Sequence, residues 1–115
     1  MLSRSASTAS SSTARKLIRT VLPLFGGGAE LIEAREREWA SATFCGARHV
    51  LVLRSRLARA DAPAPAALAL LPEHQFSLEG EIVADCAVTR VQRTTDADGQ
   101  SWLTATIELL TIAAD

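Results

Sequence analysis

The last third of the chain alternates apolar and polar residues, and this feature constrains the fold more than any other. From Glu79 to Ala113, two alternating runs flank a turn-forming segment at residues 94–100. Successive side chains of a strand point to opposite faces, so period-two alternation predicts half-buried strands and an antiparallel hairpin. The predicted buried positions are Ile82, Ala84, Cys86 and Val88 in the first strand and Leu103, Ala105, Ile107 and Leu109 in the second.

The alternation in this hairpin changes parity near Thr89–Val91 and again at Leu109–Leu110. Such a change indicates a β-bulge, or a strand that is buried on both faces at its end. The second alternative places Leu110 and Ile112 at a subunit interface. Leu110→Glu should then leave a folded monomer, whereas it should unfold the chain if Leu110 belongs to the core. Strand parity puts Asp85 on the face opposite Cys86, towards solvent or an adjacent subunit.

A first hairpin is predicted in the middle of the chain. Its first strand could also be helical, because acidic and basic side chains recur there at helical spacing. We favour a strand that is firm over Arg37–Phe44 and a returning strand over His49–Leu57. The residues between them, Cys45–Arg48, predict the turn, in which Gly46 is free to adopt positive φ.

Two helices are predicted beside these strands. Residues Ala14–Leu22 form an amphipathic helix with Ser12 or Thr13 as its N-cap. A second, short helix over Ala66–Leu71 stops at Pro72, which cannot continue it. The apolar face of the first helix is expected to pack on the domain or on a partner, and it consists of Leu17, Ile18, Val21 and Leu22.

The order of these elements is helix, strand, strand, helix, strand, strand. It predicts an α+β fold, in which two hairpins (ββαββ) form a four-stranded antiparallel sheet with helix on one face. Residues 1–28 are expected to be a disordered or weakly helical basic tail, and residues 29–115 a small α+β domain. Because a compact part of about 85 residues is only marginally stable alone, we expect a homo-oligomer.

Charge is divided unevenly along the chain. Residues 1–28 hold three Arg, one Lys and no acid, a net charge of +4, whereas residues 29–115 hold eight Arg and thirteen acids, a net charge of −5. An acidic body argues against a nucleic-acid binder, whose footprint is a basic face. No apolar run approaches the roughly 18 residues that span a bilayer, so no integral membrane contact is expected.

The basic, acid-free segment 1–28 has other interpretations. It resembles a mitochondrial presequence in composition, and a secretory signal is a further alternative, although Arg19 and Pro23 interrupt its apolar core. Plain disorder is the remaining one. We expect a cytoplasmic protein, with a mitochondrial protein that loses residues 1–28 as the alternative. N-terminal sequencing that finds Ser3–Thr13 retained would reject the cleaved leader.

Weak candidates for chemistry cluster around the first predicted turn. Cys45, Arg48 and His49 are close in sequence, and a Cys nucleophile needs a neighbouring base or positive charge to form thiolate. The alternative is a hairpin turn with a solvated Arg and an edge His. The two cysteines, Cys45 and Cys86, could form a disulfide between the hairpins, but a buried free thiol is favoured for each.

No metal or cofactor site is expected. The two cysteines and two histidines lack paired zinc-ligand spacing. Asp96 and Asp98 with Gly99 resemble the start of a calcium loop, but Ile107 stands where the twelfth-position Glu is required. A hairpin turn explains these residues better.

Three features together resemble small tail-terminator, or tail-completion, proteins of tailed phages and gene-transfer agents. They are the hairpin from Trp39 to His49, the later short helix, and the closing hairpin with Asp96-Ala97-Asp98-Gly99. The similarity spans residues 37–112. It implies a ring-forming structural protein that caps a tail tube and has no catalytic residues, and no functional residue is transferred individually.

The sequence therefore predicts a non-enzymatic protein that associates with itself through sheet or helix faces. A phage-type tail-completion protein is one alternative. A small enzyme or ligand-binding domain that uses Cys45 and His49, with Arg48 beside them, is the other. Light scattering on the oligomer and profiling of the Cys45 thiol distinguish these classes.

Overall fold

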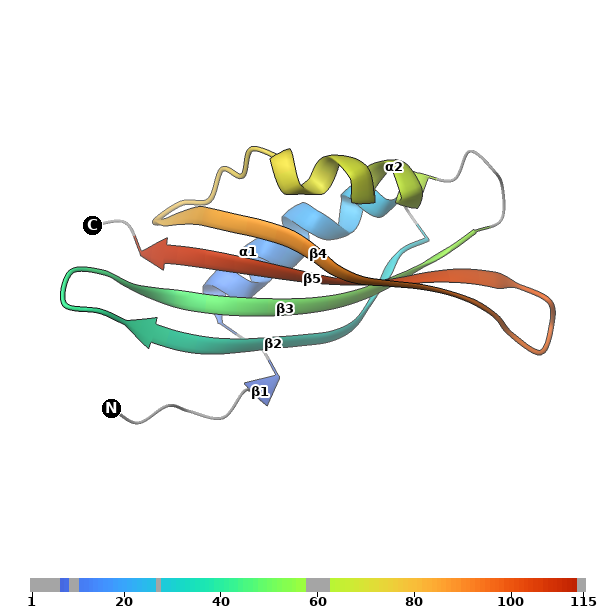
Figure 1. Cartoon of the computed structure of the whole chain (residues 1–115), viewed down its shortest axis with the longest axis horizontal. Coiled ribbons are helices and arrows are strands. Elements are labelled where there is room, and N and C mark those ends of the chain that lie inside the picture. The colour runs from blue at the N-terminus through green and yellow to red at the C-terminus, as the bar shows by residue number, and fades with distance from the viewer. Residues whose placement is uncertain (1–6, 9–10, 27, 58–62, 114–115) are drawn as a thin grey trace.

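The computed structural model describes residues 7–8, 11–26, 28–57 and 63–113. In this part of the chain, an antiparallel sheet carries two helices on one face (Figure 1). The α+β class and the four-stranded sheet built from two hairpins are confirmed, and a two-residue strand adds to one edge. In the spatial order β1-β2-β3-β5-β4, the strands are β1 (Ser7–Thr8), β2 (Glu30–Ala40), β3 (Cys45–Arg56), β5 (Ser101–Ala113) and β4 (Glu81–Thr95).

The first helix, α1, belongs to the core of the domain. It spans Ser12–Val21 and continues as a 3-10 turn over Leu22–Phe25. Its N-cap is Ser11, one residue before the predicted candidates, because the Ser11 hydroxyl accepts the backbone N–H of Ala14 at 3.0 Å. Three side chains of this segment are at most 1% exposed, so the predicted boundary at residue 28 does not separate a tail from a domain; they are Leu17, Val21 and Phe25.

The second helix, α2, starts earlier than predicted. It spans Pro63–Leu70 and is followed by a 3-10 turn over Leu71–Glu73. The α-helix ends before Pro72, as predicted, and Pro72 lies in the 3-10 turn that follows, where a proline near the start gives up no hydrogen bond. Leu71 is buried beneath this turn and joins the core under the sheet.

The turn of the first hairpin lies at Ser41–Phe44, and the prediction of a turn at Cys45–Arg48 is wrong. The Ser41 hydroxyl accepts the backbone N–H of Thr43 at 3.3 Å and that of Phe44 at 3.0 Å. The backbone N–H of Ser41 donates to the carbonyl of Phe44 at 2.7 Å. A serine side chain thus closes a turn that contains no Gly, Pro, Asn or Asp.

Strands β2 and β3 are both longer than predicted, since β2 begins at Glu30 and β3 at Cys45. Gly46 lies within β3 and is not among the glycines with positive φ, contrary to the prediction. A Cβ at this position would lie 1.9 Å from the carbonyl oxygen of Thr111 on β5. Gly46 is thus explained by the close approach of two strands, not by turn geometry.

Strand β4 contains two register irregularities, between Val83 and Asp85 and between Val88 and Arg90. The predicted parity change near Thr89 is therefore a β-bulge. The bulge at Ala84 was not predicted, and it places Ile82 and Cys86 on opposite faces. Ile82 is 55% exposed, whereas Cys86 is 8% exposed, so the predicted common face of these two residues is wrong.

Strand β5 is regular throughout and pairs with β3 without interruption. Its odd-numbered residues from Leu103 to Thr111 are buried beneath the helices. Its even-numbered residues, which include Leu110 and Ile112, point to the opposite face, which neither helix covers. The change at Leu109–Leu110 is therefore a strand with apolar residues on both faces. No helix in the described part of the chain is long and apolar enough to cross a membrane.

Candidate functional site

The predicted cluster of Cys45, Arg48 and His49 is not assembled. All three lie on β3, where alternation puts Cys45 and His49 on the helix side and Arg48 on the other side. Four strand positions separate the two helix-side residues, about 13 Å along the strand. No hydrogen bond or ion pair between these described residues joins them. Neither Arg48 nor His49 is therefore placed to activate the thiol of Cys45.

His49 is a fully buried residue of the core. Its Nε2 lies 3.2 Å from the Thr111 hydroxyl oxygen, and that hydroxyl donates to the carbonyl of Ala47 at 3.3 Å. The network assigns the ring proton to Nε2, and Nδ1 has no partner among the described residues. Burial lowers the pKa of His49 below its ordinary value, and the charges of Glu36 and Glu81 oppose that shift. His49 is thus a neutral histidine with a structural contact.

A cavity of about 450 Å³, lined in part by Thr111, lies between the N-terminal end of α1 and the ends of the strands. Three carboxylates line it: Glu36 accepts a hydrogen bond from the Ser11 hydroxyl at 3.0 Å, Glu81 accepts one from Thr13 at 2.9 Å, and Glu38 completes the set. No metal-binding group of three acidic, His or Cys residues is found among the described residues. Cys45 also lines this cavity, so the cavity keeps one of the predicted site residues.

Both cysteines are free thiols, and no disulfide joins the hairpins. Burial, with a contribution from the charge of Asp85, raises the pKa of Cys86 to about 11, so this thiol stays protonated at neutral pH. Cys45 is exposed. Any thiol chemistry of the native chain would therefore take place at Cys45.

Neither helix of the described part of the chain covers the opposite face of the sheet, which we call the open face (Figure 1). It consists of the even-numbered residues of β3 and β5 together with their paired residues on β2 and β4. At one end of it, four residues in register cross the sheet from β2 to β4. We call them the apolar row: Trp39, Gly46, Ile112 and Ile82.

The next rows of the open face carry separated charges. Arg37 and Arg48 lie on β2 and β3, and Asp85 lies across the sheet on β4, with Leu110 between them on β5. The following row runs from Arg35 through Val50 and Glu108 to Ala87. A hollow of about 190 Å³ lies among the arginines and Glu108. The β2 side of these two rows is therefore basic, and their β4 side is acidic.

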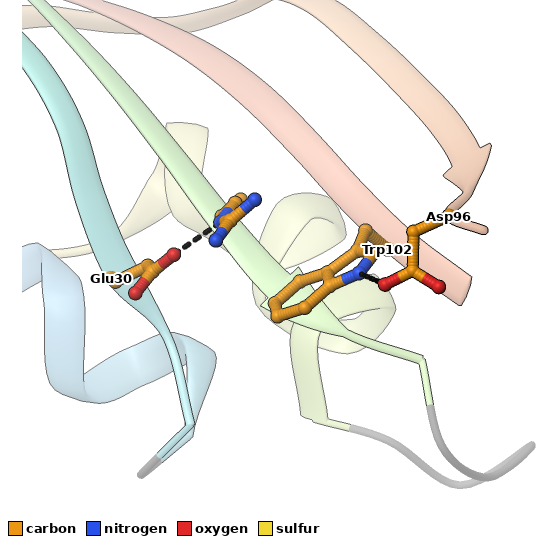
Figure 2. Close-up of polar contacts among 4 residues, drawn as sticks. Glu30, Asp96 and Trp102 are labelled. Atoms are coloured by element: carbon orange, nitrogen blue, oxygen red, sulfur yellow. Dashed lines mark hydrogen bonds and ion pairs between the residues drawn. The ribbon is translucent and has the colours of Figure 1, made fainter. Parts of the chain in front are cut away.

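The far end of the open face is organised around Trp102. Its indole N–H donates to a carboxylate oxygen of Asp96 at 3.0 Å, and the Arg54 guanidinium lies 4.3 Å from the ring centroid (Figure 2). Glu30 pairs with Arg54. The hydrogen bond from Trp102, together with backbone donors from the turn, lowers the pKa of Asp96. Asp96 also accepts the backbone N–H groups of Asp98 and Gln100, which confirms the turn.

The structure places the six residues predicted at an interface in two different environments. Leu17 and Val21 are fully buried in the chain's own core, and Ile18 and Leu22 pack at the edge of that core. Leu110 and Ile112 lie partly exposed on the open face. Ile18 and Leu22 are also partly exposed and line a surface hollow on α1, so four of the six residues are accessible to another molecule.

The acidic cavity was missed as a site from sequence, and the open face was predicted only at Leu110 and Ile112. Each is formed by residues from several strands, and only the strand register brings these residues together. The signal that pointed to the open face was the apolar parity of Leu110 and Ile112. No family model, curated protein or solved structure matches this chain.

Proposed function

We propose that this protein is a non-enzymatic structural or interaction protein that associates with itself, and that the open face is the contact surface. The observation that carries the proposal is the apolar row beside Leu110 on a face that neither helix covers. Within the apolar row, the Ile82 side chain is 55% exposed. An antiparallel sheet that faces water on one side is expected to be polar on that side. Contiguous exposed apolar side chains are typical of an interaction surface.

The size of the open face supports a stable contact. Strands are spaced about 4.8 Å apart and rise about 3.4 Å per residue, so four strands and six rows span roughly 600 Å² in projection. A standard interface buries about 800 Å² of accessible surface per partner. Because side chains add relief to the projected area, the open face is large enough to form one.

The oligomer that we expect is a closed dimer. A surface that packs on its own copy is isologous and closes at two subunits, whereas a ring requires two different surfaces. The ring implied by the resemblance to tail-completion proteins is thus a distinct outcome. It stays the alternative proposal, and the oligomer mass separates the two.

Multi-angle light scattering over a concentration series tests the proposal. We expect about 24 kDa, twice the chain mass of 12.2 kDa, at high concentration. A strict monomer at millimolar concentration would contradict self-association, and a larger closed ring would favour the alternative. Ile112→Glu, in the apolar row, should give a folded monomer, with an association at least about 100-fold weaker, the equivalent of roughly 2.7 kcal/mol. Leu70→Glu is the matched control, because Leu70 is 67% exposed on α2.

Ligand binding in the acidic cavity is the second candidate function. The specific observation is Glu81, one of whose carboxylate oxygens is buried without a partner among the described residues. Three carboxylates in one cavity favour a cationic ligand such as a primary amine. Spermidine should raise the melting temperature of the wild type and not that of Glu38→Gln. Equal melting curves with and without spermidine would reject this candidate.

We propose a cytoplasmic location. Cleavage after residue 28 would remove three core side chains that are at most 1% exposed, namely Leu17, Val21 and Phe25. This supports a mature chain that keeps α1. N-terminal sequencing of protein from native cells shows whether residues 1–28 are removed. A mature chain that starts near residue 29 would favour the mitochondrial alternative.

A further inference from the structure

We infer that two copies of this chain stack open face to open face about a two-fold axis that runs parallel to the strands. This inference rests on the proposed function, since it specifies how the self-association takes place. In this arrangement β2 of each subunit lies over β4 of the other, and β3 lies over β5. Aligned stacking of two sheets is a common packing, with strand directions within about 30° of each other.

The geometry of such an axis fixes which residues meet. Rotation by half a turn about a line parallel to the strands reverses the order of strands across the sheet and preserves position along them. Each row of one subunit therefore lies on the same row of its partner, in reversed order. The register of the sheet then predicts every cross-subunit pair.

The apolar row is complementary to itself in this arrangement. Trp39 lies opposite Ile82 of the second copy, and Gly46 lies opposite Ile112. Gly46 has no side chain, because the backbone of β5 occupies the place of a Cβ, so the Ile112 side chain of the second copy meets backbone at this position. A large side chain thus meets a small residue near the axis, and the pair occurs twice.

The charged rows bring two pairs of opposite charges together, while Arg48 lies opposite Leu110 and Glu108 lies opposite Val50. Arg37 lies opposite Asp85 of the second copy, and Glu33 lies opposite Arg90. Arg37, Asp85 and Arg90 are exposed and have no salt bridge within the described part of the subunit. Glu33 has an ion pair with Arg35 at 3.2 Å, at half-exposed positions. Arg37, Asp85 and Arg90 can therefore form ion pairs with the second copy without breaking a salt bridge of their own subunit.

Other arrangements lack this match. An axis perpendicular to the strands places β2 over β2 and reverses position along the strands. The apolar row would then meet the end of the sheet that carries Arg54 and Arg56. Arg37 would face its own strand instead of the acidic side of β4. Of these two axes, the one parallel to the strands brings Arg37 to Asp85 and the apolar row onto itself, and like charges brought together cost affinity.

A charge-swap experiment on the full chain tests the inference. Arg37→Asp and Asp85→Arg each create two like-charge contacts per dimer, so each should weaken dimerisation about 10-fold or more. The double variant Arg37→Asp/Asp85→Arg should restore the wild-type dissociation constant to within about 3-fold. An equimolar mixture of the two single variants should form mixed dimers, detected by native mass spectrometry with one chain carrying a tag.

The same variants separate failure of the arrangement from failure of the proposed function. If the wild type dimerises but neither the double variant nor the mixture restores association, the parallel axis is wrong and self-association stands. If the wild type is monomeric throughout, both are overturned. Arg19→Asp, at an exposed position of α1, is the matched control and should leave dimerisation unchanged. Circular dichroism of each variant separates loss of contact from loss of fold.

Discussion

The two faces of β5 show how one strand serves two different purposes. Leu103, Ala105, Ile107 and Leu109 are between 0 and 2% exposed beneath the helices. The even-numbered residues of β5, such as Glu108 and Leu110, point to the open face and include polar, charged and apolar side chains. Folding buries the first face in the core and leaves the second face uncovered by the helices. The composition of the second face is therefore the better indicator of function, and four predictions contrast the two.

The largest effect is expected from removing α1, the main cover of the buried face. A chain that starts at Ala29 lacks Leu17, Val21 and Phe25, so the apolar face of β3 and β5 would be exposed to water. We expect no cooperative thermal transition, because this loss exceeds the roughly 5–15 kcal/mol that stabilises a typical domain. Circular dichroism melting checks it. A truncated chain that melts cooperatively near the wild-type temperature would show that α1 is dispensable.

Substitution of two adjacent leucines compares the faces directly. Leu109 is 2% exposed beneath the helices, whereas Leu110 is partly exposed on the open face. Leu109→Ala should lower the free energy of unfolding by about 3 kcal/mol, the range for a buried leucine. Leu110→Ala should change it by less than about 1 kcal/mol in the monomer and weaken dimerisation instead. Urea unfolding at protein concentrations below the dissociation constant measures both free energies. Equal losses of unfolding free energy in the two variants would contradict the assignment of faces.

A smaller effect on the free energy of unfolding is expected from the protonation of His49, on the buried face. The pKa of His49 is lowered by burial, so below about its ordinary value of 6.5 the unfolded chain binds a proton that the folded chain resists. The free energy of unfolding should therefore fall between pH 7 and pH 5.5, and it should recover above this window. His49→Gln keeps a donor for Thr111 and should abolish this component, whereas His74→Gln should retain it. A pH dependence unchanged in His49→Gln would reject the explanation.

The smallest effect is expected at the tip of the open face, where Asp96 is fully exposed. Its pKa is lowered by the hydrogen bond from Trp102, so the charged form is favoured until the pH falls below the ordinary value of 3.8. The stability from this group is present above that value and is lost as the pH falls through the lowered pKa. The indole N–H resonance of Trp102 should report a midpoint below 3.8, and that of Trp39 should not. Asp96→Asn should remove the titration.

The hairpins and the fold class could be predicted because period-two alternation is a local signal. The first turn could not, because Ser41 closes it without any of the usual turn residues, while Gly46 resembles a turn glycine and is required by a close strand approach. The start of β2 was missed for a related reason. Its acidic and basic residues occupy both faces of an edge region, so their spacing is compatible with a helix and with a strand.

The open face could be predicted only in part. Leu110, Ile112 and Asp85 were placed on it by parity alone. The bulges at Ala84 and Thr89 move Ile82 and Arg90 onto the same face, and a bulge is not visible in the sequence of one strand. The rows also depend on the register between strands that are distant in sequence. The complementarity of the rows therefore emerges only from the folded structure.

The central claim is that self-association buries the open face, and site-specific thiol labelling tests it most directly. A Cys45→Ser background removes the exposed native thiol, and Val50→Cys then places one near the middle of the open face. Ala66→Cys, at an exposed position of α2, is the control. The account predicts that the labelling rate at position 50 falls when the concentration rises above the dissociation constant, while the rate at position 66 stays constant. Equal labelling of position 50 in the monomer and in the oligomer would contradict the claim.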